Sequence, residues 1–261
     1  MNHTTLKTWM QACERIARVA GQRILEIYDT DFDVHSKADH SPLTLADLAA
    51  HRSIVEALKR LSPRIPVLSE ESAEIPYEER SSWDRYWLVD PLDGTKEFVK
   101  RNGEFTVNIA LIQRHQAILG IVYAPVPNTL YSAAVGHGAF KNGTAITVTQ
   151  PCAQPPRIVG SRSHADGPMR GYLEKLGEHR FVSMGSSLKL CLVAEGAADL
   201  YPRLGPTSEW DTAAAQAVVE QAGGRVTDMD RKPLRYNTKE TLLNPHFFVF
   251  GDHDIHWPQY L

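Results

Sequence analysis

Residues 87–98 read WLVDPLDGTKEF, an apolar strand-like run that ends in two carboxylates and a turn. Pro91 and Gly94 favour a turn, and this turn directs the carboxylates of Asp90 and Asp93 toward a common point. Buried carboxylates without partners are very costly to ionise, so the sequence predicts a positive charge beside them. The surroundings are rich in oxygen and lack cysteine and histidine, which favours a hard cation such as Mg²⁺. The alternative is an ordinary polar turn between a strand and a helix.

Composition places the chain among ordinary globular proteins. Its 261 residues are 43% hydrophobic and 23% charged, enough for one large domain or two packed halves. The net charge of −3 argues against binding to a nucleic acid polymer. Residues 1–10 do not form a secretory leader, and no apolar run approaches the roughly 20 residues of a membrane span, so we expect a cytoplasmic protein. The three cysteines show no metal-type spacing and are expected to be reduced thiols.

Two helices are predicted at the start of the chain. Apolar residues recur every three or four positions over residues 6–28, which predicts an amphipathic helix. A second helix is expected over residues 45–61, with Thr44 as its N-cap and Asp47 in its first turn, where the helix dipole favours a carboxylate. Its predicted buried face consists of Leu45, Leu48, Ala49, Ile54, Val55 and Leu58.

A second pair of acids follows a short predicted strand at residues 65–68. The next residues read SEES, and adjacent side chains of an extended segment point in opposite directions. Glu70 is therefore predicted as a metal ligand, with Glu71 behind it. The alternative is a solvated loop. Residues 75–85 are charged and loop-like, and a mobile lid is one hypothesis for them.

The remaining strands fall into two patterns. Runs at 105–112, 117–124, 130–135, 138–141 and 146–148 are joined by short turns and predict an antiparallel meander. Proline-rich residues 149–157 mark a boundary between predicted domains 1–150 and 151–261, two subdomains of one catalytic unit. Beyond it, strands at 157–160, 180–183, 199–201, 225–227 and 246–250 alternate with helices at 168–176, 187–195 and 211–222. The fold class is thus α+β in the first half and layered α/β in the second.

Asp211 opens a longer motif, WDTAAAQAVVEQAGGRV at residues 210–226. An aspartate at a helix start is commonly only a capping or dipole partner. If Asp211 instead faces the same cavity as Asp90, Asp93 and Glu70, four carboxylates converge. That much negative charge in one site predicts two or more Mg²⁺ ions.

Such a site suits the hydrolysis of a phosphate ester. Paired divalent cations neutralise the charge that grows on the attacking and leaving oxygens. Thr95 is expected to orient the attacking water, with Asp47 accepting a hydrogen bond from it, because a threonine without a neighbouring base is a poor nucleophile. The backbone N–H groups of Gly94 and Thr95 can cradle phosphate oxygens.

Three motifs together resemble one family. WLVDPLDGT, SEES and WDTAAAQAVVEQAGG look like the signature segments of the inositol monophosphatase-like phosphatases, which are Mg²⁺-dependent and Li⁺-sensitive. The resemblance covers almost the whole chain and implies an αβαβα sandwich with two or three Mg²⁺ ions. It assigns Asp47, Thr95 and Glu71 to catalysis and Lys37 to an auxiliary position near the third metal. It implies as metal ligands Glu70, Asp90, the Leu92 carbonyl, Asp93 and Asp211.

Within that family, residues 90–112 and 185–214 resemble the bacterial 3′(2′),5′-bisphosphate nucleotidases. This implies hydrolysis of adenosine 3′,5′-bisphosphate to AMP, with 3′-phosphoadenylyl sulfate as a second substrate and a role in sulfur assimilation. Lys189 and Arg203 are expected to neutralise the second phosphate, against the alternative of solvated surface charges. The implied substrate contacts are Glu70, Leu92, Asp93, Gly94, Thr95, Ser161, His164, Ser186, Lys189, Arg203 and Asp211.

Two other functions compete with this prediction. An inositol monophosphatase, or another small-molecule phosphomonoesterase, can use the same scaffold and metal site. A non-catalytic nucleotide sensor is a different class, and the water-orienting Thr95 speaks against it. The nucleotidase group is described as peripheral on the cytoplasmic face of the inner membrane, but no amphipathic basic segment here explains such binding. The sequence does not define an oligomeric state.

Overall fold

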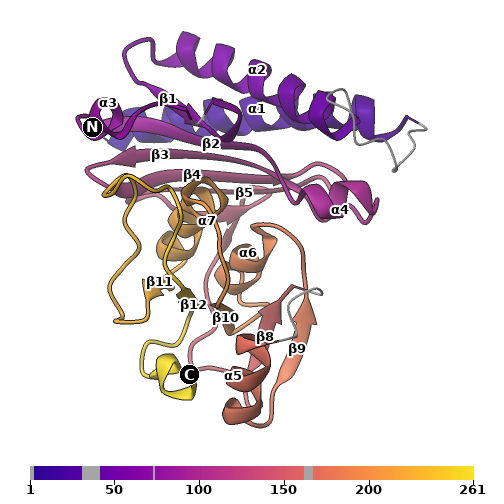
Figure 1. Cartoon of the computed structure of the whole chain (residues 1–261), viewed down its shortest axis with the longest axis vertical. Coiled ribbons are helices and arrows are strands. Elements are labelled where there is room, and N and C mark those ends of the chain that lie inside the picture. Colours follow the sequence, from indigo (N-terminus) through magenta and orange to yellow (C-terminus); the bar gives the residue numbers. More distant parts are fainter. Residues whose placement is uncertain (1–2, 31–41, 73, 162–166) are drawn as a thin grey trace.

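Five layers stack along the long axis of the molecule, in the order helices, sheet, helices, sheet, helices (Figure 1). The computed structural model describes residues 3–30, 42–72, 74–161 and 167–261. Lys37 and His164 therefore lie outside the described residues. The layering confirms the predicted αβαβα sandwich. Within the described ranges, no helix is both long enough and apolar enough to cross a membrane.

The first layer pairs α1 (His3–Tyr28) with α2 (Pro42–Leu61). Both helices were expected, but α2 begins at Pro42. Thr44 is therefore not its N-cap, and Asp47 lies in its second turn. The predicted buried face was wrong at Leu45, which is 46% exposed, and Leu48, Ala49 and Val55 are only partly buried. The helix instead buries small residues that allow close packing, a preference that a count of large apolar side chains misses. Its fully buried apolar positions are Ala46, Ala50, Ile54 and Leu58.

The second layer is a seven-stranded sheet in which β1 pairs with β2 in parallel and all other neighbours are antiparallel. The predicted meander is confirmed. Alternate residues of β2 face opposite layers, so that Trp87 packs toward α1 and α2 while Leu88 faces the central helices. The strands are β1 (Val67–Ser69), β2 (Arg85–Asp93), β3 (Thr106–Gln113), β4 (Gln116–Ala124), β5 (Thr129–Ala134), β6 (Gly138–Lys141) and β7 (Thr144–Ile146).

The segment between β1 and β2 differs from its prediction. Strand β1 is displaced toward the acids, which form a 3-10 turn, η1 (Glu70–Ser72), and are followed by α3 (Tyr77–Arg80). Arg80 is only 2% exposed and its guanidinium donates hydrogen bonds to Asn237 Oδ1 and to the Glu240 carbonyl. These hydrogen bonds anchor α3 to residues 237–240, which argues against a mobile lid at residues 75–85.

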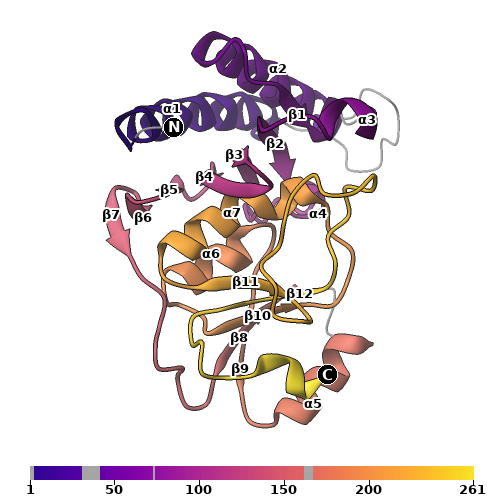
Figure 2. The ribbon, with the colours of Figure 1, turned by 90° about the vertical axis from the view of Figure 1, so that its left-hand side faces the viewer.

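The central layer consists of α6 (Leu188–Ala194) and α7 (Glu209–Gln221), which lie between the two sheets (Figures 1 and 2). Helix α7 packs against β3 and β4. Gly120 makes this approach possible, because a Cβ at Gly120 would lie 2.0 Å from the carbonyl oxygen of Ala214. The helix that carries Asp211 is thus held directly on the first sheet.

We expect Gly120→Ala to lower the free energy of unfolding by about 3 kcal/mol, because the added methyl group pushes α7 away from β4. Gly171 is the matched control, because it lies inside helix α5 (Pro168–Leu176) and a Cβ added there would meet nothing within 4 Å. Gly171→Ala should stabilise the protein by about 0.5 to 1 kcal/mol. Urea denaturation followed by circular dichroism measures both changes, and equal stability of Gly120→Ala and wild type would contradict the prediction.

The fourth layer is a five-stranded sheet in the order β11-β12-β10-β8-β9, covered on its outer face by α5 and η2. The predicted alternation of strands and helices is confirmed, with boundaries shifted by one or two residues. These elements are β8 (Arg157–Gly160), α5 (Pro168–Leu176), β9 (Arg180–Ser183), β10 (Leu200–Arg203), β11 (Arg225–Asp228), β12 (Phe247–Phe250) and η2 (Trp257–Tyr260).

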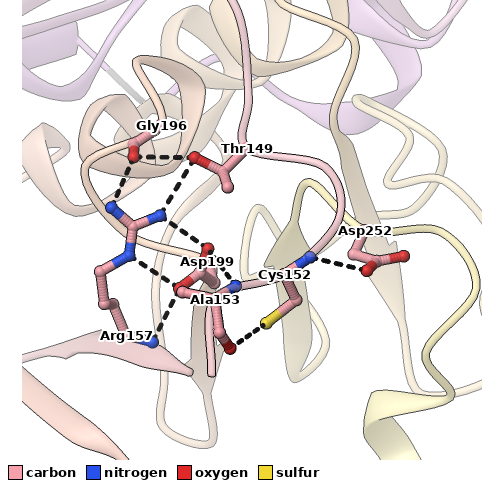
Figure 3. Close-up of polar contacts among 7 residues, drawn as sticks. All are labelled: Thr149, Cys152, Ala153, Arg157, Gly196, Asp199 and Asp252. Carbon is pink, nitrogen blue, oxygen red and sulfur yellow. Dashed lines mark hydrogen bonds and ion pairs between the residues drawn. The ribbon is translucent and has the colours of Figure 1, made fainter. Parts of the chain in front are cut away.

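The connection between the sheets runs from β7 past the central helices to β8 (Figure 2). It is pinned by Arg157, whose Nε and Nη2 donate to the two carboxylate oxygens of Asp199 at 2.8 and 2.7 Å (Figure 3). Arg157 also donates to Thr149 Oγ1 at 3.0 Å and to the Gly196 carbonyl at 2.8 Å. This bidentate contact fixes the connection on the second sheet. The division into domains 1–150 and 151–261 stays a prediction.

Candidate active site

An acid cluster forms where β2 ends. The pairing of β2 with β3 is interrupted between Asp90 and Asp93, and Asp90 Oδ1 accepts a hydrogen bond from the Leu92 N–H at 3.0 Å. One carboxylate oxygen from each of Asp90, Asp93 and Asp211 lies within 4.8 Å of the others. The structure therefore brings Asp211 of α7 together with the two acids at the end of β2, at a spacing that suits one shared cation.

Asp211 serves as a helix cap and also belongs to the cluster. Its Oδ2 accepts the Ser208 N–H at 2.8 Å in a capping box at the start of α7. A carboxylate has a second oxygen, so capping the helix leaves acceptor capacity for the acid cluster. The two interpretations of Asp211 drawn from the sequence are thus both satisfied by one side chain.

The other predicted acids border this cluster. The Glu70 carboxylate lies beside that of Asp90, and the Glu71 carboxylate lies beside that of Asp47. The assignment of Glu70 as a metal ligand with Glu71 behind it stays a prediction, and the alternation used to separate the two was wrong because η1 is not extended. Asp47 Oδ1 is buried without a hydrogen-bond partner among the described residues. A buried carboxylate oxygen in that state is ready to accept a hydrogen bond from a water or ligand.

Crowding raises the pKa values of these acids. Burial, then repulsion by Asp93 and Glu70, raises the pKa of Asp90 well above its ordinary value. Burial and then Asp93 raise the pKa of Asp211 to about 7. Burial, then Glu71 and Glu70, raise the pKa of Asp47 to about 8. Cations would relieve this repulsion, and a donor set made of carboxylate oxygens fits a hard ion such as Mg²⁺.

Gly94 allows the chain to turn immediately after Asp93. Its φ is +94°, and a Cβ there would lie 3.2 Å from the Glu104 carbonyl and 3.3 Å from Ser186 Cβ. Both observations favour glycine. The turn leads into α4 (Thr95–Val99), so that Thr95 begins a helix beside the acids. The expected orientation of a water by Thr95 and Asp47 stays a prediction.

A cavity of about 280 Å³ opens beside the cluster. Both acidic and cationic side chains line its wall. The predicted substrate residues that line it are Asp93, Gly94, Thr95, Ser161, Ser186, Lys189, Arg203 and Asp211.

Lys189 is buried in this wall, with 7% of its surface exposed. Its Nζ donates to the Ser186 carbonyl at 2.6 Å and lies 5.6 Å from the centroid of the Tyr201 ring. Burial lowers the pKa of Lys189 to about 8, although Asp93 acts in the opposite direction. The alternative of a solvated surface charge is therefore wrong for Lys189. Arg203 is half-buried, and its Nη2 donates to the Pro206 carbonyl at 2.8 Å.

The sequence did not single out two polar contacts of the site. Asn108 lies in the apolar strand β3, and its Nδ2 is 2.8 Å from Ser187 Oγ. Glu104 Oε2 accepts the Gly185 N–H at 2.8 Å. The one available signal was Asn108 itself, a polar residue in an otherwise apolar run. Such a residue in a buried strand requires a partner, but the sequence does not say which one.

Comparison with solved structures gives the same fold. CysQ from Bacteroides thetaiotaomicron, a bacterial member of the inositol monophosphatase family, is 44% identical and superposes with a TM-score of 0.84, covering 94% of this chain and 97% of that one. An inositol monophosphatase from Zymomonas mobilis is 24% identical, with a TM-score of 0.80 and coverage of 97% and 96%. At that identity the likeness shows the fold alone.

Comparison of the amino-acid sequence with known proteins points to the same family. The 3′(2′),5′-bisphosphate nucleotidase CysQ of Shigella flexneri is 57% identical over 92% of this chain and 98% of its own length. CysQ of Escherichia coli strain K12 is 56% identical with the same coverage. The model of the inositol monophosphatase family matches residues 5–250. The chain therefore belongs to the inositol monophosphatase family.

Proposed function

We propose that the chain is a Mg²⁺-dependent 3′(2′),5′-bisphosphate nucleotidase that hydrolyses adenosine 3′,5′-bisphosphate to AMP and phosphate. This proposal rests on one observation. Asp93 and Asp211, which can bind cations, and the buried Lys189, which can bind a second phosphate, line the same cavity. The relatives with 56% and 57% identity bear the name of this activity. We extend the proposal to 3′-phosphoadenylyl sulfate as a second substrate, and to a cytoplasmic role in sulfur assimilation by resemblance.

The acids supply the cation site. Two or three Mg²⁺ ions would be held by the side chains of Glu70, Asp90, Asp93 and Asp211 and by the Leu92 carbonyl. When bound, they neutralise charge on the phosphate oxygens and make water a better nucleophile. The chain's own donors to the phosphate are the backbone N–H groups of Gly94 and Thr95.

Asp47 and Thr95 orient the attacking water, with the Glu71 carboxylate beside Asp47. The unpartnered Oδ1 of Asp47 provides the acceptor that such a water needs. The water oxygen bonds to phosphorus as the bond from phosphorus to the 3′ oxygen breaks. The water gives up one proton and the released 3′ oxygen takes one up, so no proton is consumed overall. The products are AMP and inorganic phosphate.

Lys189 and Arg203 select for a second phosphate. At pH 7 a lysine with a pKa of about 8 is mostly charged, so Lys189 can pair with a phosphate. The Lys189 ammonium has three N–H groups. One donates to the Ser186 carbonyl, and the others are able to donate to phosphate oxygens. Ser161 and Ser186, which line the same cavity, add hydroxyl donors to the nucleotide, and His164 is assigned to the base by resemblance alone.

We expect the wild-type chain to hydrolyse adenosine 3′,5′-bisphosphate with a higher kcat/KM than inositol 1-phosphate at the same Mg²⁺ concentration. Lys189→Met keeps the length of the side chain but removes its charge. It should raise KM for the bisphosphate by about 10- to 100-fold, the cost of one charged hydrogen bond, and change inositol 1-phosphate turnover much less. Phosphate-release kinetics measure both.

Lys59→Met is the control, because Lys59 is an exposed residue in the last turn of α2. It should behave as wild type with both substrates. A strong preference of the wild type for inositol 1-phosphate would overturn the proposed substrate. An equal effect of Lys189→Met on both substrates would overturn the role of Lys189.

A further inference from the structure

Ser187 joins the two halves of the site through one small side chain. It precedes α6 and is 1% exposed. Its N–H and its hydroxyl oxygen each lie 2.6 Å from Oδ2 of Asp93. The same hydroxyl oxygen lies 2.7 Å from the carbonyl oxygen of Asp211. Ser187 therefore contacts the end of β2 and the start of α7 at once.

Asn108 restricts how the Ser187 hydroxyl can bond. Its Nδ2 donates to Ser187 Oγ at 2.8 Å and lies 3.5 Å from Asp93 Oδ2. A hydroxyl has a single hydrogen, so Ser187 Oγ accepts from Asn108 and donates toward Asp93 or the Asp211 carbonyl. The ionised carboxylate is the stronger acceptor. The Asp93 carboxylate is thus fixed through Oδ2, and its other oxygen is left free of these hydrogen bonds.

The same contacts dock the turn that carries Lys189. The Gly185 N–H donates to Glu104 Oε2 at 2.8 Å, and the Ser187 N–H donates to Asp93. Lys189 in turn is held by the Ser186 carbonyl. Two backbone donors of this turn are therefore bound by carboxylates of the first half of the chain, which fixes where the Lys189 ammonium lies.

We propose that Ser187, supported by Asn108, is a positioning residue that holds the Asp93 carboxylate in the orientation needed for cation binding and docks the turn of residues 185–189 onto it. The proposal rests on the proposed function, because it takes Asp93 as a cation ligand. Ser187 lines the same cavity but is only 1% exposed, and its N–H and hydroxyl are engaged by Asp93 and the Asp211 carbonyl, so it acts through these residues. Partners that orient a metal ligand typically contribute about 10- to 100-fold to metal affinity.

Mg²⁺ binding to the whole chain without nucleotide, measured by isothermal titration calorimetry, tests the proposal. Ser187→Ala should raise the Kd for Mg²⁺ by about 10- to 100-fold. Asn108→Leu is nearly isosteric and leaves the Ser187 hydroxyl in place, so it should raise that Kd by about 2- to 10-fold, the worth of one neutral hydrogen bond.

Ser62→Ala is the matched control. Ser62 is also buried, accepts a hydrogen bond from Trp87 Nε1 at 2.8 Å and donates one to the Leu58 carbonyl at 3.2 Å. It should lower the melting temperature in EDTA and leave Mg²⁺ affinity unchanged. Mg²⁺ affinity of Ser187→Ala equal to that of wild type, with a loss of stability like that of Ser62→Ala, would overturn the proposal.

The outcome also separates this proposal from the proposed function. If the wild type prefers inositol 1-phosphate while Ser187→Ala still weakens Mg²⁺ binding, the substrate assignment fails and the positioning role stands. If the wild type binds Mg²⁺ and hydrolyses the bisphosphate while both Ser187→Ala and Asn108→Leu bind Mg²⁺ normally, only the positioning role fails. A wild type that binds no Mg²⁺ overturns both.

Discussion

Asp90→Asn is expected to lower kcat/KM for adenosine 3′,5′-bisphosphate by about 10³-fold, or about 4 kcal/mol, because it removes a charge that holds the cations. The change keeps the shape of the side chain, which is 1% exposed. The amide oxygen can still accept the Leu92 N–H, so the local turn is retained. Phosphate-release kinetics over a range of Mg²⁺ concentrations measure the loss.

A melting curve in EDTA distinguishes loss of the cation site from unfolding. Because Asp90 is repelled by Asp93 and Glu70, the amide should leave the metal-free protein as stable as wild type or more so. Asp84→Asn is the control, since Asp84 is exposed and forms a surface ion pair with Arg114 at 3.2 Å. Activity of Asp90→Asn within a few-fold of wild type would remove Asp90 from the cation site.

The stability of the metal-free protein is expected to fall as pH rises from about 4 to about 8, by about 2 to 4 kcal/mol after allowance for solvent screening. The pKa values of Asp211 and Asp47 are raised from 3.8 to about 7 and about 8. Between these limits the folded chain holds protons that the unfolded chain has released. The unfolded state therefore binds fewer protons, and stability decreases with increasing pH.

Mg²⁺ should reverse this trend, because the cations compete with the protons for the same carboxylates. The gain in melting temperature on adding Mg²⁺ is therefore expected to be larger at pH 8 than at pH 5.5. Differential scanning calorimetry in EDTA and in Mg²⁺ at both pH values measures it. Asp47→Asn removes one of the titrating groups and should flatten the pH dependence in EDTA. A metal-free protein that becomes more stable between pH 5.5 and 8 would contradict this account.

The sequence predicted the elements that carry regular patterns. The helix over residues 6–28, the meander from β3 to β7 and the alternation in the second half follow from apolar periodicity and turn residues, which act locally. The acids at 90, 93 and 211 were found because each follows or begins a strongly patterned element. The sequence did not establish that these three acids lie close together, because no local pattern indicates which distant segments pack against each other.

The predictions that failed depend on tertiary packing. Thr44 is a good capping residue, but Pro42 begins the helix earlier, and Leu45 faces solvent because alanines pack on the inner side. The acids 70 and 71 were treated as extended, but they form a 3-10 turn. Arg80 is held by residues more than 150 positions away, which no local pattern reveals.

Because α7 lies between the two sheets, the acid cluster cannot be completed until late in the synthesis of the chain. Asp211 belongs to the last fifth of the chain, and it reaches the other acids only when its helix has settled against Gly120. A nascent chain on the ribosome already carries β2 and its two aspartates, yet its acid cluster lacks the third member. The proposed hydrolysis therefore requires that the C-terminal segment carrying α7 has emerged and packed on the first sheet.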